Sequence, residues 1–128
     1  MKKRKVYICF DYDNDSDIKG SLVSQAKLND SPFDITDMSI KETISSKWKD
    51  EARKRIKGCD VVIVLCGKYT DTAPGVSAEL TITQEENKPY FLLEGHGNKS
   101  VPPKGALKTD VMHKWQWDNL KRLINGGR

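Results

Sequence analysis

The sequence predicts a three-layer α/β sandwich in which helices cover both faces of a five-stranded parallel sheet of order 2-1-3-4-5. Residues 61–65 form an unbroken, mostly β-branched apolar run, which is typical of a strand buried on both faces. Other strand-like segments alternate with helical patterns along the chain, as they do around parallel sheets. In this order the first and third strands are neighbours, so the loops after Phe10 and Cys66 should flank one crevice.

The first part of the chain supplies two strands and one helix. Residues 5–10 are expected to form the first strand, and residues 33–38, which alternate in polarity, a strand nearer the sheet edge. Between them, residues 16–28 carry apolar residues at helical spacing, and Asp15 or Ser16 is expected to cap this helix. Its apolar stripe consists of Ile18, Leu22, Val23 and Ala26.

A second helix is expected to begin after Ser39 and to end near Lys57, before the central strand at residues 60–66. Its apolar residues recur at the spacing of a buried helical stripe. They are Ile44, Trp48, Ala52 and Ile56.

Residues 74–86 fit two patterns. Apolar and polar residues alternate from Val76 to Ile82, which indicates a strand. However, the segment lies between the strand candidates 60–66 and 90–93, and two parallel strands need a crossover of about a dozen residues, usually helical. We therefore predict a helix, for which Pro74 is a favourable first residue.

The last part of the chain begins with a long connection at residues 94–108, which is rich in Gly, Pro, Lys and Ser. A plain surface connection is the favoured interpretation, and a lid over the crevice is the alternative. A short edge strand at residues 111–115 and a final helix should follow. The apolar side of that helix consists of Trp117, Leu120, Leu123 and Ile124. No internal repeat or second domain is visible, so residues 1–128 are expected to form a single domain.

The composition suits a soluble domain, because 37% of the 128 residues are apolar and 31% are charged. No apolar run approaches the roughly 20 residues that span a bilayer. The basic start precedes too short an apolar run for an export signal, so a cytoplasmic location is expected. The three cysteines lie in or beside apolar strands and are interpreted as reduced thiols. No metal site is expected, since neither a CxxC nor an HxxxH pair is present.

The charge pattern does not favour nucleic acid as a partner, although the net charge is +4. The basic segment 47–57 also contains Asp50 and Glu51, and its basic face carries no interleaved aromatic residues for base stacking. The acidic loop at residues 11–17 resembles a calcium loop, but it lacks the required Gly and Glu at the sixth and twelfth positions. Asp15 or Ser16 is expected to cap the next helix while its neighbours face water.

Three common uses of such a fold lack their key residues. No phosphate-binding GxxxxGK[ST] loop is present. The acidic loop after the first strand would repel the phosphate of a flavin. A phosphorelay receiver needs an Asp at the end of its third strand, where this chain has Cys66 and Gly67.

The remaining candidate is Glu79, near the start of a helix and expected to stand over the open crevice. No His or Ser partner for acyl transfer lies near it in the sequence. A lone carboxylate suits a reaction with a sugar-cation transition state, because it stabilises positive charge and hydrogen-bonds ribose hydroxyls. Cleavage of the nicotinamide–ribose bond of NAD is such a reaction. The alternative is that Glu79 only favours the positive end of the helix.

Several short motifs resemble the TIR-like domains of bacterial defence, including the NAD-processing TIR-like subunit of Thoeris anti-phage systems. They are VVIVLCGKYT, GVSAEL and ENKPYF, together with the first-strand end FDY and the closing HKWQWDNL. The residues that match the family pattern are Gly67, Thr70, Val76, Glu79, Leu80, Lys88 and Pro89. The resemblance covers nearly the whole chain and implies a flavodoxin-like sheet.

By this resemblance, Glu79 is the catalytic glutamate and NAD is the substrate, with no further cofactor. The substrate-binding residues that it implies are Phe10, Asp11, Tyr12, Asp37, Ser39, Gly67, Thr70 and Val76. The product would be ADP-ribose or a cyclised isomer that activates a separate effector after phage infection. One departure is Gly75, which stands where many members have Trp.

The resemblance also allows a function without catalysis. TIR-type domains assemble with one another through loops and helices, so self-association is a possible partner interaction. In that case Glu79 is structural and the basic second helix is a docking face. The sequence leaves the enzyme and the interaction module both open.

Overall fold

In the computed structural model the chain is described at residues 4–11, 14–28, 31, 33–38, 46–95 and 97–126, without the side chains of residues 16, 36–38 and 98. Within these residues, the strands are β1 (Arg4–Cys9), β2 (Phe33–Met38), β3 (Val61–Cys66), β4 (Tyr90–Glu94) and β5 (Met112–His113). They form a parallel sheet of order β2-β1-β3-β4-β5. The helices are α1 (Ser16–Ala26), α2 (Ser46–Lys57), α3 (Pro74–Glu85) and α4 (Trp117–Ile124). The predicted fold class and strand order are confirmed.

Strand β3 lies at the centre of the sheet, between β1 and β4, and both of its faces are apolar. Every residue from Val61 to Cys66 is buried. Val62 is in register with Tyr7 of β1 on one side and with Tyr90 of β4 on the other. The crossover helices thus leave this strand without a solvated face, as expected for the core of a parallel sheet.

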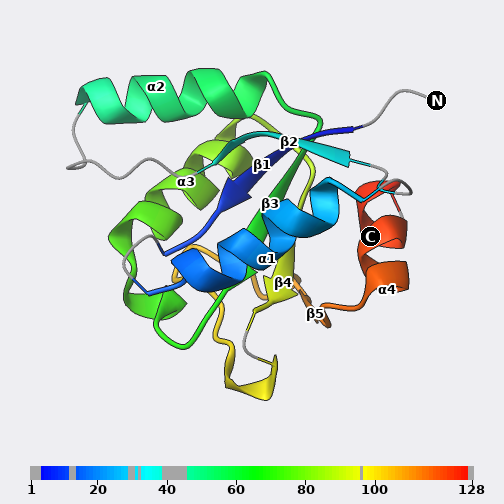
Figure 1. Cartoon of the computed structure of the whole chain (residues 1–128). Helices are drawn as coiled ribbons and strands as arrows, with labels where there is room; N and C mark the ends of the chain where they lie inside the picture. The colour runs from blue at the N-terminus through cyan, green and yellow to red at the C-terminus, as the bar shows by residue number, and fades with distance from the viewer. Residues whose placement is uncertain are drawn as a thin grey trace.

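Two apolar layers separate the sheet from its helices. Alternate residues of β1, such as Val6 and Ile8, pack with α1 and α4 on one face. Tyr7 and Cys9 point to the other face, where they pack with α2 and α3, because successive side chains of a strand point in opposite directions. Figure 1 shows α1 across one face of the sheet, with α4 beside it, and α2 with α3 on the other side.

The ambiguous segment 74–86 is helical, as the topology requires. Helix α3 begins at Pro74 and ends at Glu85. Val76, Leu80 and Thr83 lie on its buried side, which is the three-to-four-residue spacing of a helix rather than the alternation of a strand. The need for a crossover therefore outweighed the local alternation.

Several element bounds differ from the predicted ones by one or two residues. Strand β5 contains only Met112 and His113 instead of residues 111–115, because it pairs with β4 over two positions at the sheet edge. Helix α2 begins at Ser46. Ile44, which was expected on the buried stripe of this helix, lies outside the described residues.

Hydrogen bonds hold the connection after β4 against the rest of the protein at several points. The Val101 amide donates to the Gly67 carbonyl at 3.0 Å, and the Gln84 side-chain amide donates to the Gly105 carbonyl at 3.0 Å. The Tyr90 hydroxyl donates to Asp110 at 2.7 Å. These bonds favour the plain surface connection over a lid. Among the described helices, none has the length and apolar character to cross a membrane.

Candidate functional site

The Glu79 side chain lies between α3 and the sheet, under the layer that α2 and α3 form. The Tyr7 hydroxyl donates a hydrogen bond to Glu79 Oε2. The Cys9 thiol donates to Glu79 Oε1 at 3.5 Å. Tyr7, Cys9 and Glu79 all have 0% of their surface exposed. Strand β1 and helix α3 therefore place a carboxylate and two donors inside the protein.

This burial differs from the expectation that Glu79 stands over the mouth of an open crevice. That expectation is wrong for the described conformation, because the residue has no accessible surface. A buried carboxylate is costly unless hydrogen bonds compensate the lost hydration. Tyr7 and Cys9 supply such bonds. The catalytic role of Glu79 stays a prediction, and a substrate would reach the carboxylate only after it moves or its cover opens.

The buried thiols of the same layer are donors rather than nucleophiles. Burial, followed by the charge of Glu79, raises the pKa of the Cys9 thiol well above its ordinary value. Burial also raises the pKa of Cys66 to about 12. Both thiols are therefore protonated at neutral pH, and a protonated thiol is a poor nucleophile. The three cysteines are free, as expected from the sequence.

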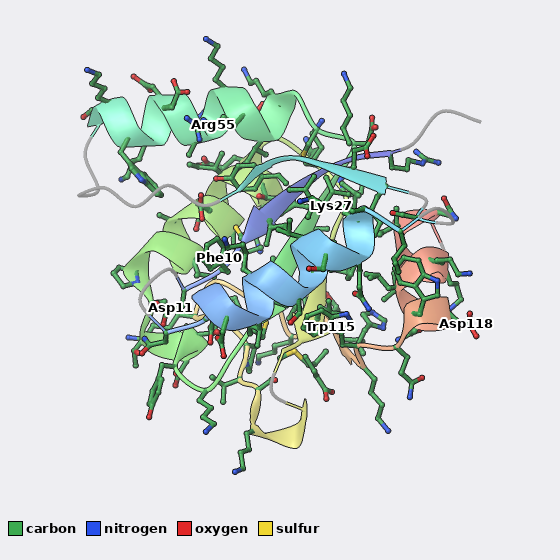
Figure 2. All side chains as sticks on the ribbon, in the orientation of Figure 1. Phe10, Asp11, Lys27, Arg55, Trp115 and Asp118 are labelled. Carbon is green, nitrogen blue, oxygen red and sulfur yellow. The ribbon has the colours of Figure 1, made fainter. Side chains whose placement is uncertain are left out.

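Phe10 and Asp11 lie at the carboxyl end of β1, beside the start of α1 (Figure 2). Phe10 belongs to the apolar cluster beneath α1, with the Lys19 ammonium 5.8 Å from its ring centroid. The Asp11 carboxylate accepts a bond of 2.7 Å from the Asn14 side chain, and its carbonyl accepts the Asp15 amide. The structure thus packs Phe10 on the opposite face of the sheet from Glu79. The binding roles of Phe10 and Asp11 stay predictions.

The loops after β1 and β3 meet, as the strand order predicted, and Asp15 fills the space between them. A Cβ added at Gly67 would lie 2.2 Å from Asp15 Oδ1. Asp15 holds the N-cap position of α1, but its side chain makes no capping hydrogen bond. The capping prediction is therefore wrong for Asp15, and the side chain of Ser16, its alternative, lies outside the described part of the chain. The Gly67 amide donates to Thr70 Oγ1 at 2.7 Å. Gly67 is therefore required by close packing, and Thr70 is buried as part of the same turn.

The remaining residues predicted to bind substrate are scattered or undescribed. Val76 is 1% exposed and packs in the cluster under α2 and α3. Asp37 lies in β2, but only its backbone is described. Tyr12 and Ser39 lie outside the described residues. Val76 lies on the same buried side of α3 as Glu79, and the binding roles of these residues stay predictions.

Glu79 does not line either of two cavities on the described surface. One, of about 460 Å³, lies against the first turns of α3 and includes Lys49 and Lys104 among its lining residues. The other, of about 520 Å³, lies at the carboxyl end of β4 and includes Glu94 and Trp115. No group of three or more His, Cys, Asp or Glu side chains in the described part of the chain could hold a metal ion.

Sequence reasoning missed Tyr7 and Cys9 as partners of Glu79. A signal existed in the first strand, where both residues fall on the same side of an otherwise apolar segment and both carry a donor. That side is the one that α3 covers. Polar atoms on a strand side that must be buried require a partner, and Glu79 provides it.

The fold is that of a flavodoxin-like α/β domain. Among solved structures, the chain is similar to one described as the crystal structure of a prokaryotic SEFIR domain, with a TM-score of 0.58 and 16% sequence identity. The similarity covers 95% of this chain and 92% of that chain, and at this identity it concerns the fold alone.

The chain belongs to the family described as Thoeris protein ThsB, TIR-like domain, whose model matches residues 7–100. The match includes Tyr7, Cys9 and Glu79 and ends within the connection after β4. No curated protein gives a significant match.

Proposed function

We propose that the protein cleaves the nicotinamide–ribose bond of NAD and that Glu79 is the carboxylate that assists this step. The observation that carries the proposal is a fully buried carboxylate, held by Tyr7 and Cys9, in a TIR-like chain. An apolar residue at this position would fill the layer between α3 and the sheet without the cost of burying a charge. A costly buried group of this kind is a candidate functional residue.

The proposed reaction breaks the bond between nicotinamide nitrogen and the ribose anomeric carbon. The electron pair of that bond goes to nicotinamide, which leaves as a neutral molecule, and positive charge develops on the ribose. The Glu79 carboxylate stabilises this charge and accepts hydrogen bonds from ribose hydroxyls. Water then attacks the anomeric carbon and loses a proton to solvent, which gives ADP-ribose. Attack by a nucleophilic atom of the same molecule, with loss of any proton which that atom carried, gives a cyclic ADP-ribose instead. We further propose that this product is the signal to a downstream effector.

A non-enzymatic interaction module is the second candidate, in which Glu79 is a structural residue. A carboxylate with 0% exposure contributes to packing without any substrate. Gly75, where many TIR-like domains have Trp, points the same way: a Cβ added there would meet no atom within 4 Å. In this case the chain acts by self-association, and its size in solution should change with a phage-derived trigger and not with NAD.

The proposal is tested by infecting cells that express the full chain and analysing their lysates for ADP-ribose-type products by mass spectrometry. Infection supplies the trigger, so a silent assay of the isolated protein does not end the test. We expect these products and free nicotinamide to rise after infection only in expressing cells. Unchanged NAD and no such product in infected cells that contain the folded protein would contradict the proposal and favour the interaction module.

A further inference from the structure

The hydrogen bonds to Glu79 stabilise a conformation in which no substrate touches the carboxylate, because Glu79 has no exposed surface. We propose that Tyr7 is a positioning residue that holds Glu79 in this withdrawn state and so restrains activity until the carboxylate is released. The inference rests on the proposed NAD-cleaving function. By this inference, strand β1 regulates activity through Tyr7 in addition to forming part of the sheet.

Tyr7 is the stronger of the two donors. Its hydroxyl donates to Oε2, whereas the Cys9 contact to Oε1 is 3.5 Å long and comes from a thiol, which is a weak donor. Tyr7 also has a fixed position, because its strand pairs with β2 and with β3 on its two sides. We therefore assign the movement on release to the side chain of Glu79, which is carried by helix α3 and not by the sheet.

The size of the effect follows from the equilibrium between withdrawn and released states. A hydrogen bond to a charged group contributes more than a neutral one, enough to change an equilibrium constant about tenfold. Removing the Tyr7 donor weakens the withdrawn state and raises the population of the released state. At subsaturating NAD, the rate of nicotinamide release should rise by the same factor. A residue with a merely structural role would lower this rate or leave it unchanged.

The test compares Tyr7→Phe with the wild type, with and without lysate of infected cells. We expect Tyr7→Phe to release nicotinamide about tenfold faster without lysate and to be stimulated less by it. Tyr69→Phe is the matched control, since Tyr69 is 56% exposed and should behave as wild type. Cys9→Val removes the weaker donor and should give a smaller increase, which provides a second variant if Tyr7→Phe folds poorly. The inference would be overturned if the triggered wild type is active but both folded variants, without lysate, release nicotinamide no faster than the wild type does.

A double-mutant cycle in urea separates this inference from the proposed function. We expect the losses of stability in Tyr7→Phe and Glu79→Leu to be strongly non-additive, because each change removes the same hydrogen bond. Additive losses overturn the restraint by Tyr7 whether or not the chain is an enzyme. The losses could instead be non-additive while no protein, including the triggered wild type, releases nicotinamide. That result would overturn the proposed function, and the hydrogen bond between Tyr7 and Glu79 would then have no role in catalysis.

Discussion

Replacing Glu79 by Gln is expected to reduce nicotinamide release from triggered protein by at least about 100-fold. The amide has nearly the shape of the carboxylate but carries no charge, so it cannot stabilise a positively charged ribose. The Gln oxygen still accepts one bond in the place where Tyr7 donates. The loss should therefore appear in the rate of the chemical step, measured as nicotinamide by chromatography at saturating NAD.

Glu85→Gln is the matched control for this substitution. Glu85 ends the same helix, and its side chain is 54% exposed in an ion pair of 2.7 Å with Arg53. The same chemical change there should leave nicotinamide release at the wild-type rate. Equal release from a folded Glu79→Gln variant and from wild type would remove Glu79 from the reaction and leave it a structural residue.

Replacing Gly67 by Ala is expected to lower the free energy of unfolding by about 1–3 kcal/mol. The new methyl group would lie 2.2 Å from Asp15 Oδ1 and 2.5 Å from Asp15 Cγ. Asp15 is 1% exposed, so its carboxylate has little room to shift. The two loops at the carboxyl edge of the sheet would therefore have to separate. Urea unfolding monitored by circular dichroism gives the change.

Gly20→Ala provides the opposite expectation in the same assay. Gly20 lies within α1, and a Cβ added there meets no atom within 4 Å. Because glycine costs conformational entropy in a helix, this substitution should raise stability by about 0.5–1 kcal/mol. A Gly67→Ala variant as stable as wild type would show that Asp15 does not pack on Gly67 in solution.

The strands were predictable because they depend on patterns within short segments, and the sheet order followed from the alternation of strands and helices along the chain. The apolar run at residues 61–65 has no solvated face, which places it at the centre of the sheet. Helix α3 needed a topological argument, because its residues from Val76 to Ile82 alternate like a strand. Only the crossover between β3 and β4 required it to be a helix.

The site was less predictable, because its contacts join residues far apart in the sequence. Tyr7 and Glu79 are separated by 72 positions, and no local pattern shows that one donates to the other. Likewise, nothing in the loop before α1 shows that Asp15 packs on Gly67. The sequence indicates that Glu79 lies near the carboxyl edge of the sheet, but the burial of its side chain depends on how the layers pack.

The placement of Phe10 could have been predicted. Side chains alternate along a strand, so Phe10 at the end of β1 falls on the side opposite Tyr7 and Cys9. The structure places it in the cluster beneath α1 and the other two beneath α3. A pocket that contains both Phe10 and Glu79 would need a rearrangement at the end of β1.

The central claim is that the Glu79 carboxylate gives up its hydrogen bond from Tyr7 and binds the ribose of NAD instead. The most direct measurement is a structure of the triggered protein bound to a non-cleavable NAD analogue. We predict that the Glu79 carboxylate lies within hydrogen-bond distance of the ribose that carries nicotinamide and no longer accepts the Tyr7 hydroxyl. A bound analogue with Glu79 still enclosed beside Tyr7 and Cys9 would contradict the claim.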